Sequence, residues 1–347
     1  MRARSWLGGA AFAVAVVVLA VVLVAGPRDR GPGLECNGSA DLCDLRLDQV
    51  ALATTHNSMN AAVDGFVEPS QRSGIGQQLA DGVRGFLVDA FLGSVRQTRE
   101  GEEVVHTDLD RRRLARALSL VGPAAAKRAL LLRREVGPPA ANAPREIYLC
   151  HRLCELGAVR FGDVVELLRR FLEENPGEVL VVVVQDELPA EELLPVLTEG
   201  GLDPYLATID PAQPMPTLRA MVDSGRRVLL GLERGDLGPR IPNLYDGGLL
   251  QDVPHDYASA DELEDADSCR AYRGEPDAPL LLLNHWVTPP SEETAAEVNA
   301  EDVLSARADR CAQERGRPVN LVAVDFYETG ALMDVVTELD RQALGGG

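Results

Sequence analysis

Apolar runs of strand length recur along the chain, and segments of helical periodicity separate them. The runs are QVALAT, GFLVDAF, IYLC, VLVVVVQ, RVLLGLE, LLLLNHW and NLVAVDFY, with EVVHT as a candidate eighth. Between them, FGDVVELLRRFLEEN places Val164, Leu168 and Phe171 on one helical face. Strands that stay apolar on both faces and alternate with helices are typical of a buried parallel sheet. The pattern predicts an α/β fold, a closed (β/α)8 barrel of the TIM type, regular or distorted.

Most of these runs end on a polar or ionisable residue. In a (β/α)8 barrel the carboxyl ends of all strands open on one face, which we call the mouth, and active sites are built there. A strand that turns polar where it meets solvent would explain any single position, but three of the five histidines of the chain are strand-end residues. The strand-end residues are His56, Asn57, Asp89, His151, Gln185, Asp186, Glu187, Glu233, Asn284, His285 and Asp325.

Two of these histidines, His56 and His151, suit the chemistry of a phosphodiester. One imidazole can take a proton from an attacking hydroxyl while the other protonates the leaving oxygen, and each transfer is worth roughly 10² to 10⁴ in rate. A carboxylate behind the base fixes its tautomer, and Asp325 is the candidate. The sequence has no GxSxG elbow, no glycine-rich phosphate loop and no HExxH motif. We therefore predict acid and base catalysis by these three residues.

Composition and charge narrow the class of partner. The chain is 46% hydrophobic and 25% charged, which is typical of a globular protein with a sizeable core. Its formal net charge of -20 argues against nucleic acid, because affinity for a polyanion depends on Lys and Arg. We expect a monomer that binds no nucleic acid.

The first 26 residues predict export. Arg2 and Arg4 precede an uncharged apolar run from Trp6 to Gly26, long enough to cross a hydrocarbon core of roughly 30 Å as a helix. The length favours an uncleaved membrane anchor over a cleaved signal peptide, although residues 24–26 offer a small-residue cleavage site. The protein is expected at the extracytoplasmic face of the cell membrane, or secreted if it is cleaved. Residues 27–44 would form a tether with a first disulfide, and residues 45–347 the barrel.

The cysteines fit an exported protein. An even number of them in an exported chain predicts disulfides, and the absence of a CxxC pair argues against zinc. About fifteen pairings are possible for six cysteines. The spacing favours Cys36 with Cys43, Cys150 with Cys154, and Cys269 with Cys311.

A helical insertion is expected at about residues 99–145. It contains RRRLARALSLVGPAAAKRALLLRRE, a cluster of positive charge in an otherwise acidic chain. Basic amphipathic helices can lie on an anionic membrane surface. We favour the alternative, a solvated helical hairpin broken at Gly122 and Pro123.

Five sequence blocks, in this order, resemble the catalytic X domain of phosphatidylinositol-specific phospholipase C, in its secreted bacterial and fungal branch. They are THNSM at 55–59, GVRGFLVDAF at 82–91, YLCH at 148–151, FLEENPGEVLVVVVQDE at 171–187 and NLVAVDFYETG at 320–330. The resemblance covers roughly Leu45 to Leu344. It implies that His56 deprotonates the inositol 2-hydroxyl, that His151 protonates the diacylglycerol oxygen, and that Asp325 supports the base. The products would be a cyclic inositol phosphate and diacylglycerol.

The chain departs from the resemblance where phosphoryl charge is stabilised. Metal-independent bacterial members carry an arginine at the position of Asp89. Calcium-dependent members use an asparagine and three carboxylates, of which Asn57 and Asp89 are present, whereas Leu87 and Gln185 replace two glutamates. Because a phosphoryl transition state needs positive charge, we expect Asn57 and Asp89 to hold a weakly bound Ca²⁺ or Mg²⁺. The alternative is that no metal binds.

The remaining strand-end residues are assigned to the substrate, a phospholipid or other phosphodiester. Trp286 could line a headgroup pocket beside His285, His106 is expected at the surface, and His255 has no role. The residues predicted to bind the substrate are Gln185, Glu187, Glu233, Asn284 and His285.

Two other functions stay open. A barrel of the glycerophosphodiester phosphodiesterase or sphingomyelinase D type also uses two histidines and a metal, but its ExD-like carboxylate pair is reduced here to LVD. A barrel that has lost catalysis could bind a glycan or lipid headgroup. Leu87 and Gln185 favour that loss, and the two histidines with Asp325 oppose it.

Overall fold

A computed structural model describes residues 33–138 and 142–345 of the chain. The predicted membrane anchor, residues 1–26, lies outside this range, so it stays a prediction. No helix within the described ranges is long and apolar enough to span a bilayer. From Leu34 onward the chain forms one unit, built around a single sheet.

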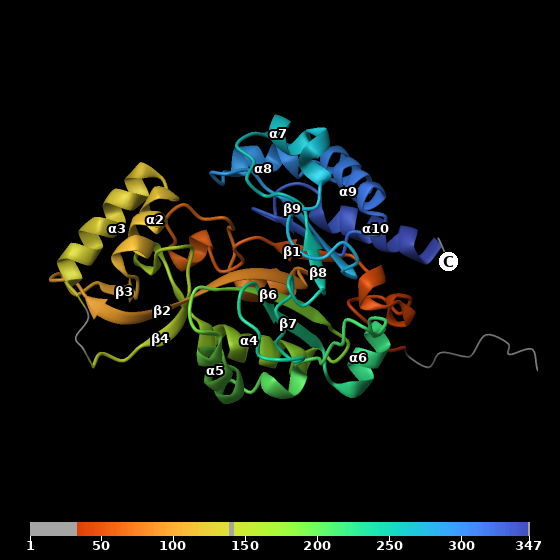
Figure 1. The fold of residues 1–347 in the computed structure, drawn as a ribbon, viewed down its shortest axis with the longest axis horizontal. Helices are drawn as coiled ribbons and strands as arrows, with labels where there is room; N and C mark the ends of the chain where they lie inside the picture. The colour runs from red at the N-terminus through yellow and green to blue at the C-terminus, as the bar shows by residue number, and fades with distance from the viewer. Residues whose placement is uncertain (1–32, 139–141, 346–347) are drawn as a thin grey trace, which may run out of the picture. The chain divides into compact units, whose positions relative to one another are not determined.

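Parallel strands form the curled centre of this sheet (Figure 1). Their hydrogen-bonded order is β7 (Val228–Leu232), β6 (Leu180–Asp186), β2 (Gly85–Gln97), β1 (Leu52–Thr55), β10 (Leu321–Val324), β9 (Leu280–His285) and β8 (Leu250–Asp252). Among the described strands, no ladder joins β7 to β8. The expectation of a closed barrel is therefore wrong, and the sheet is a half-barrel whose strands all open at one mouth.

Alternation along β6 shows why these runs form the core. Val182 and Val184 pack outward in the same apolar cluster as Leu168 of helix α4 (Phe161–Glu174). Val181 and Val183 point inward to a second apolar cluster inside the half-barrel. Both faces are covered, as the continuous apolar run predicts. The other helices longer than one turn on this body are α1 (Ile75–Ala80), α5 (Leu193–Glu199), α6 (Leu218–Ser224), α7 (Ala260–Glu264), α8 (Glu292–Val298), α9 (Glu301–Arg315) and α10 (Leu332–Gly345).

The outer half of β2 leaves the half-barrel and builds an antiparallel arm. It pairs with β3 (Glu103–Thr107) and β4 (Glu146–Leu149), and β5 (Val159–Arg160) pairs antiparallel with β4. EVVHT and IYLC therefore form this arm, and the prediction that IYLC is a parallel barrel strand is wrong. A short apolar run carries no information on strand direction, which is set by the partner strand.

The predicted helical hairpin is present on this arm, as α2 (Arg111–Ser119) and α3 (Pro123–Val136) (Figure 1). Ala125 and Ala129 of α3 pack against Leu153 and Leu156, in the segment that follows β4. His106, which was expected at the surface, is buried on β3 with 8% of its area exposed, because α3 covers this strand.

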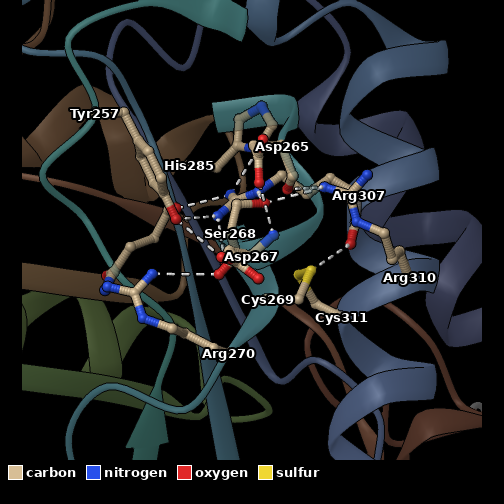
Figure 2. Close-up of a disulfide and its surroundings, with 11 residues drawn as sticks. Tyr257, Asp265, Asp267, Ser268, Cys269, Arg270, His285, Arg307, Arg310 and Cys311 are labelled. Atoms are coloured by element: carbon tan, nitrogen blue, oxygen red, sulfur yellow. Dashed lines mark hydrogen bonds between the residues drawn. A yellow bond between two sulfur atoms is a disulfide. The ribbon is translucent and has the colours of Figure 1, made fainter. Parts of the chain in front are cut away.

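All three predicted disulfides are confirmed, Cys36–Cys43, Cys150–Cys154 and Cys269–Cys311. The last joins helix α9 to the segment before β9, beside the fully buried Arg307 (Figure 2). The Arg307 guanidinium donates to the backbone oxygen of Asn284, to Tyr257 Oη, to Ser268 and to His285 Nδ1. This network fixes α9 behind the sheet.

Candidate active site

A pocket of about 230 Å³ opens at the mouth, at the carboxyl ends of the parallel strands. It brings together residues that lie far apart in the sequence. The predicted site residues that line it are His56, Asn57, Asp89, His151, Gln185, Glu233, Asn284 and Asp325. Glu187 and His285 are not part of this lining.

His56 and Asp325 form a hydrogen-bonded pair on one wall of the pocket. The strands β1 and β10 are neighbours in register, with Thr55 opposite Val324, so the next residue of each strand comes to the same place. His56 Nδ1 lies 2.9 Å from Asp325 Oδ1. With Nδ1–H donating to the carboxylate, Nε2 of His56 is left unprotonated and can accept a proton. Asn299 Nδ2 donates to the Asp325 backbone oxygen, at 2.9 Å, and steadies the pair.

Trp286 lies flat on the His56 ring. The two ring centroids are 3.7 Å apart and the planes differ by 4°. Trp286 also stacks with His255, at 6.2 Å between centroids, and His255 meets Tyr272 edge to face. This aromatic array limits the rotation of His56. The sequence offered no signal for His255, which comes to the pocket on the loop after β8.

His151 reaches the pocket by a route that the sequence did not predict. Strand β4 runs antiparallel to β2, with Leu149 opposite Ala90, so its carboxyl end points back toward the mouth. The Cys150 amide donates to the Asp89 backbone oxygen at 3.1 Å, and His151 follows at the rim. Burial, the charge of Arg152 and that of His56 lower the pKa of His151. Both imidazoles line the same pocket, and the charge of His56 acts on His151.

The loop that carries His151 is held tightly. The Cys150–Cys154 disulfide closes it, and the Cys154 amide donates to Thr107 Oγ1 at 2.8 Å. The Glu155 side chain is fully buried and accepts from the Thr107 amide, the Thr107 hydroxyl and Arg133 of α3. The helical hairpin therefore anchors the loop that carries His151, a predicted catalytic residue. The basic composition of the hairpin did not suggest this role.

Burial and neighbouring charges shift the pKa values of His56 and Asp89, two residues of the pocket lining, in opposite directions. Burial and the positive charge of Arg152 lower the pKa of His56 below its usual value, so this ring is neutral at neutral pH. On the neighbouring strand β2, burial and the negative charge of Glu233 raise the pKa of Asp89 to about 8. Arg273, another lining residue, is paired with Asp252 at 2.6 Å and with Glu233 at 3.1 Å.

The donor set of the pocket fits a divalent ion poorly. Asn57 and Asp89 both line it, but the other two positions that would carry carboxylates hold Leu87 and Gln185, which also line the pocket. Within the described part of the chain, no group of three or more His, Cys, Asp and Glu side chains could hold a metal. The Glu233 carboxylate is already engaged by Arg273. Ca²⁺ takes about six to eight oxygen ligands, more than these residues supply.

Two residues predicted to bind the substrate are engaged elsewhere. Glu187 is paired with Arg113 of α2 at 2.9 Å and with Arg234 at 2.5 Å, outside the lining of the pocket. His285 is fully buried and lies beside Arg307 (Figure 2). Its Nε2–H donates to the Val298 backbone oxygen at 2.7 Å. Consecutive strand residues point to opposite sides, so Trp286 lines the mouth while His285 faces the helices.

The chain matches one protein-family model and is similar to several solved structures. The family model described as PI-PLC X 1 matches residues 138–340. Among solved structures, the chain is similar to a phosphatidylinositol-specific phospholipase C from Listeria monocytogenes, with 12% identity, a TM-score of 0.49, and coverage of 87% of this chain and 97% of that one. It is also similar to the Staphylococcus aureus phosphatidylinositol-specific phospholipase C, with 12% identity and a TM-score of 0.49. That match covers 86% of this chain and 93% of that one. A calcium-dependent phosphoinositol-specific phospholipase C from Pseudomonas sp. is 10% identical, with a TM-score of 0.39. That match covers 84% of this chain and 93% of that one. A search of curated protein sequences gives no match.

The matched segment begins after the block that contains His56 and includes both His151 and Asp325. It spans more than half of the 347 residues. On this ground the chain belongs to the X-domain family of phosphatidylinositol-specific phospholipase C.

Proposed function

We propose that the protein is a phosphodiesterase that cleaves phosphatidylinositol or a related lipid phosphodiester. The observation that carries the proposal is the meeting of His56 and His151 in one pocket, with Asp325 bonded behind His56 at 2.9 Å. The resemblance of the sequence blocks supports inositol as the headgroup.

In the proposed reaction, Nε2 of neutral His56 removes the proton of the inositol 2-hydroxyl. That oxygen forms a bond to phosphorus, and the bond from phosphorus to the diacylglycerol oxygen breaks. His151 gives its proton to the departing oxygen. The products are a cyclic inositol phosphate and diacylglycerol, and Asp325 stabilises the imidazolium that forms on His56.

The protonation of His151 depends on the substrate. Its lowered pKa means that the free enzyme holds this ring neutral at neutral pH, whereas a general acid must be protonated. A phosphodiester carries one negative charge, and its binding beside the ring favours the imidazolium. Binding of the anionic substrate therefore favours the protonated form of His151, which acts as the general acid.

A panel of phosphodiesters, assayed with calcium, with magnesium and with chelator, tests the proposal. His56→Ala and His151→Ala should each abolish release of cyclic inositol phosphate, followed by phosphorus NMR, while melting temperature stays near that of the wild type. His106→Gln, at a histidine outside the pocket lining, is the matched control and should keep turnover. Wild-type turnover in either alanine variant would show that the two-histidine mechanism is wrong.

A second candidate function is binding without catalysis, which the apolar Leu87 in the pocket wall favours. Saturable binding of inositol with no turnover of any phosphodiester would support it.

We also propose that the protein acts outside the cytoplasm. Three disulfides within the described residues fit an oxidising compartment. Anchoring through residues 1–26 remains the prediction of the sequence alone.

A further inference from the structure

One pocket residue has a charge that the proposed reaction needs and that the sequence blocks do not supply. We propose that the guanidinium of Arg152, not a divalent ion, neutralises the phosphoryl oxygens of the substrate. The inference rests on the proposed function and names its missing cationic group. Arg152 lines the pocket together with His56, His151 and Asp89.

The backbone at Arg152 is held in an unusual conformation. Its φ is 68°, in the left-handed region that residues other than glycine rarely adopt. Such outliers persist only where the surroundings enforce them, and they concentrate at functional sites. Here the Cys150–Cys154 disulfide and the hydrogen bond from the Leu153 amide to the His151 oxygen, at 2.8 Å, fix the loop. The loop presents His151 and Arg152 to the same pocket.

The guanidinium is held in place by a neutral group. Arg152 Nη1 donates to the backbone oxygen of Leu120, at the end of α2, which also lines the pocket. None of the ion pairs among the described residues involves Arg152, whereas Arg273 on the same lining is paired with two carboxylates. Burial lowers the pKa of Arg152, and the carboxyl groups of Asp89, Asp256 and Glu68 oppose this shift through their charge. The charge of Arg152 thus stays available to an anionic ligand.

Arg152 shares the pocket lining with both histidines of the proposed reaction. Its positive charge also lowers the pKa of His56 and that of His151. A planar guanidinium can give two parallel hydrogen bonds to phosphate oxygens. Such a group does the electrostatic work that a metal ion would otherwise do. Arg152 would then supply the positive charge at a pocket whose residues around Asp89 offer too few ligands for a metal ion.

The substitution Arg152→Asn tests this role, because asparagine removes the charge and tolerates the left-handed backbone. We expect kcat/KM for phosphatidylinositol vesicles to fall about 10²- to 10³-fold, the usual loss for one charge-stabilising donor. Arg152→Lys should restore part of the loss. Arg128→Asn, at an exposed arginine of α3, makes the same change in net charge and should leave turnover unchanged. Wild-type turnover should survive chelator.

A second measurement does not depend on turnover. The imidazole signals of His56 and His151 report, by NMR, their pKa values and the binding of inorganic phosphate. Removing a positive charge should raise both pKa values in Arg152→Asn, since the charged imidazoles are then less repelled. Phosphate should bind at least about tenfold more weakly in this variant.

The outcomes separate this inference from the proposed function. A wild type that turns over only with calcium, or an Arg152→Asn variant with unchanged phosphate affinity and histidine pKa values, would overturn the role of Arg152 and leave the phosphodiesterase intact. A wild type that binds phosphate through Arg152 but cleaves no phosphodiester would instead overturn the proposed function.

Discussion

Replacing Asp325 by asparagine should reduce kcat about 10³-fold. When His56 accepts a proton it becomes an imidazolium, whose Nδ1 lies 2.9 Å from Asp325 Oδ1. Two unit charges with centres about 4 Å apart attract by about 4 kcal/mol at an effective dielectric constant near 20. A tenfold change in rate corresponds to about 1.36 kcal/mol, so loss of this attraction costs about three decades. Steady-state release of cyclic inositol phosphate at pH 7 measures the effect.

The matched control is Asp340→Asn. Asp340 also accepts a hydrogen bond, from the Ala51 amide at 2.8 Å, but it does so just before β1, at the end of the strand away from His56. This variant should keep the wild-type kcat. If Asp325→Asn loses less than tenfold while its melting temperature is unchanged, the carboxylate does not stabilise an imidazolium and the reasoning is refuted.

Three further predictions concern the loop, the buried arginine and pH. The double variant Cys150→Ser with Cys154→Ser should remain folded by circular dichroism but lose at least about tenfold in kcat, because the closed loop no longer fixes His151; unchanged kinetics would contradict this. Arg307→Met should lower the free energy of unfolding in urea by about 3 kcal/mol, because several buried acceptors lose their donor, and a loss below about 1 kcal/mol would argue against that network. Burial raises the pKa of Asp340 to about 6, so the folded state holds its proton more tightly than the unfolded chain, and this contribution to stability is lost as pH rises toward 6. Asp340→Asn should therefore melt above the wild type at pH 8 but not at pH 4, and equal melting at both would count against the raised pKa.

Part of the site was predictable because it depends on neighbouring parallel strands. His56 and Asp325 each follow an apolar run, and β1 and β10 pair in register. Parallel strands bring their carboxyl ends to one edge, so residues at these ends meet whatever their separation in sequence. The same argument predicted that Asp89 and Glu233 share the pocket.

His151 was predicted for a reason that proved wrong. Its strand was expected to be parallel, yet β4 runs antiparallel to the outer half of β2 and turns back to the mouth. Both directions bury the same residues of IYLC, so the apolar pattern is the same for each.

The sequence by itself determined the class of fold, the pairing of the cysteines and the strand-end histidines, because each leaves a local mark: apolar periodicity, spacing, or a polar residue after a buried run. Only the tertiary structure decided that the sheet is a half-barrel, that His285 faces away from the mouth, and that Arg152, Arg273 and His255 enter the pocket. Those outcomes depend on strand direction and on the paths of loops, which are set by contacts between distant segments. Neighbouring residues in the sequence carry no record of such contacts.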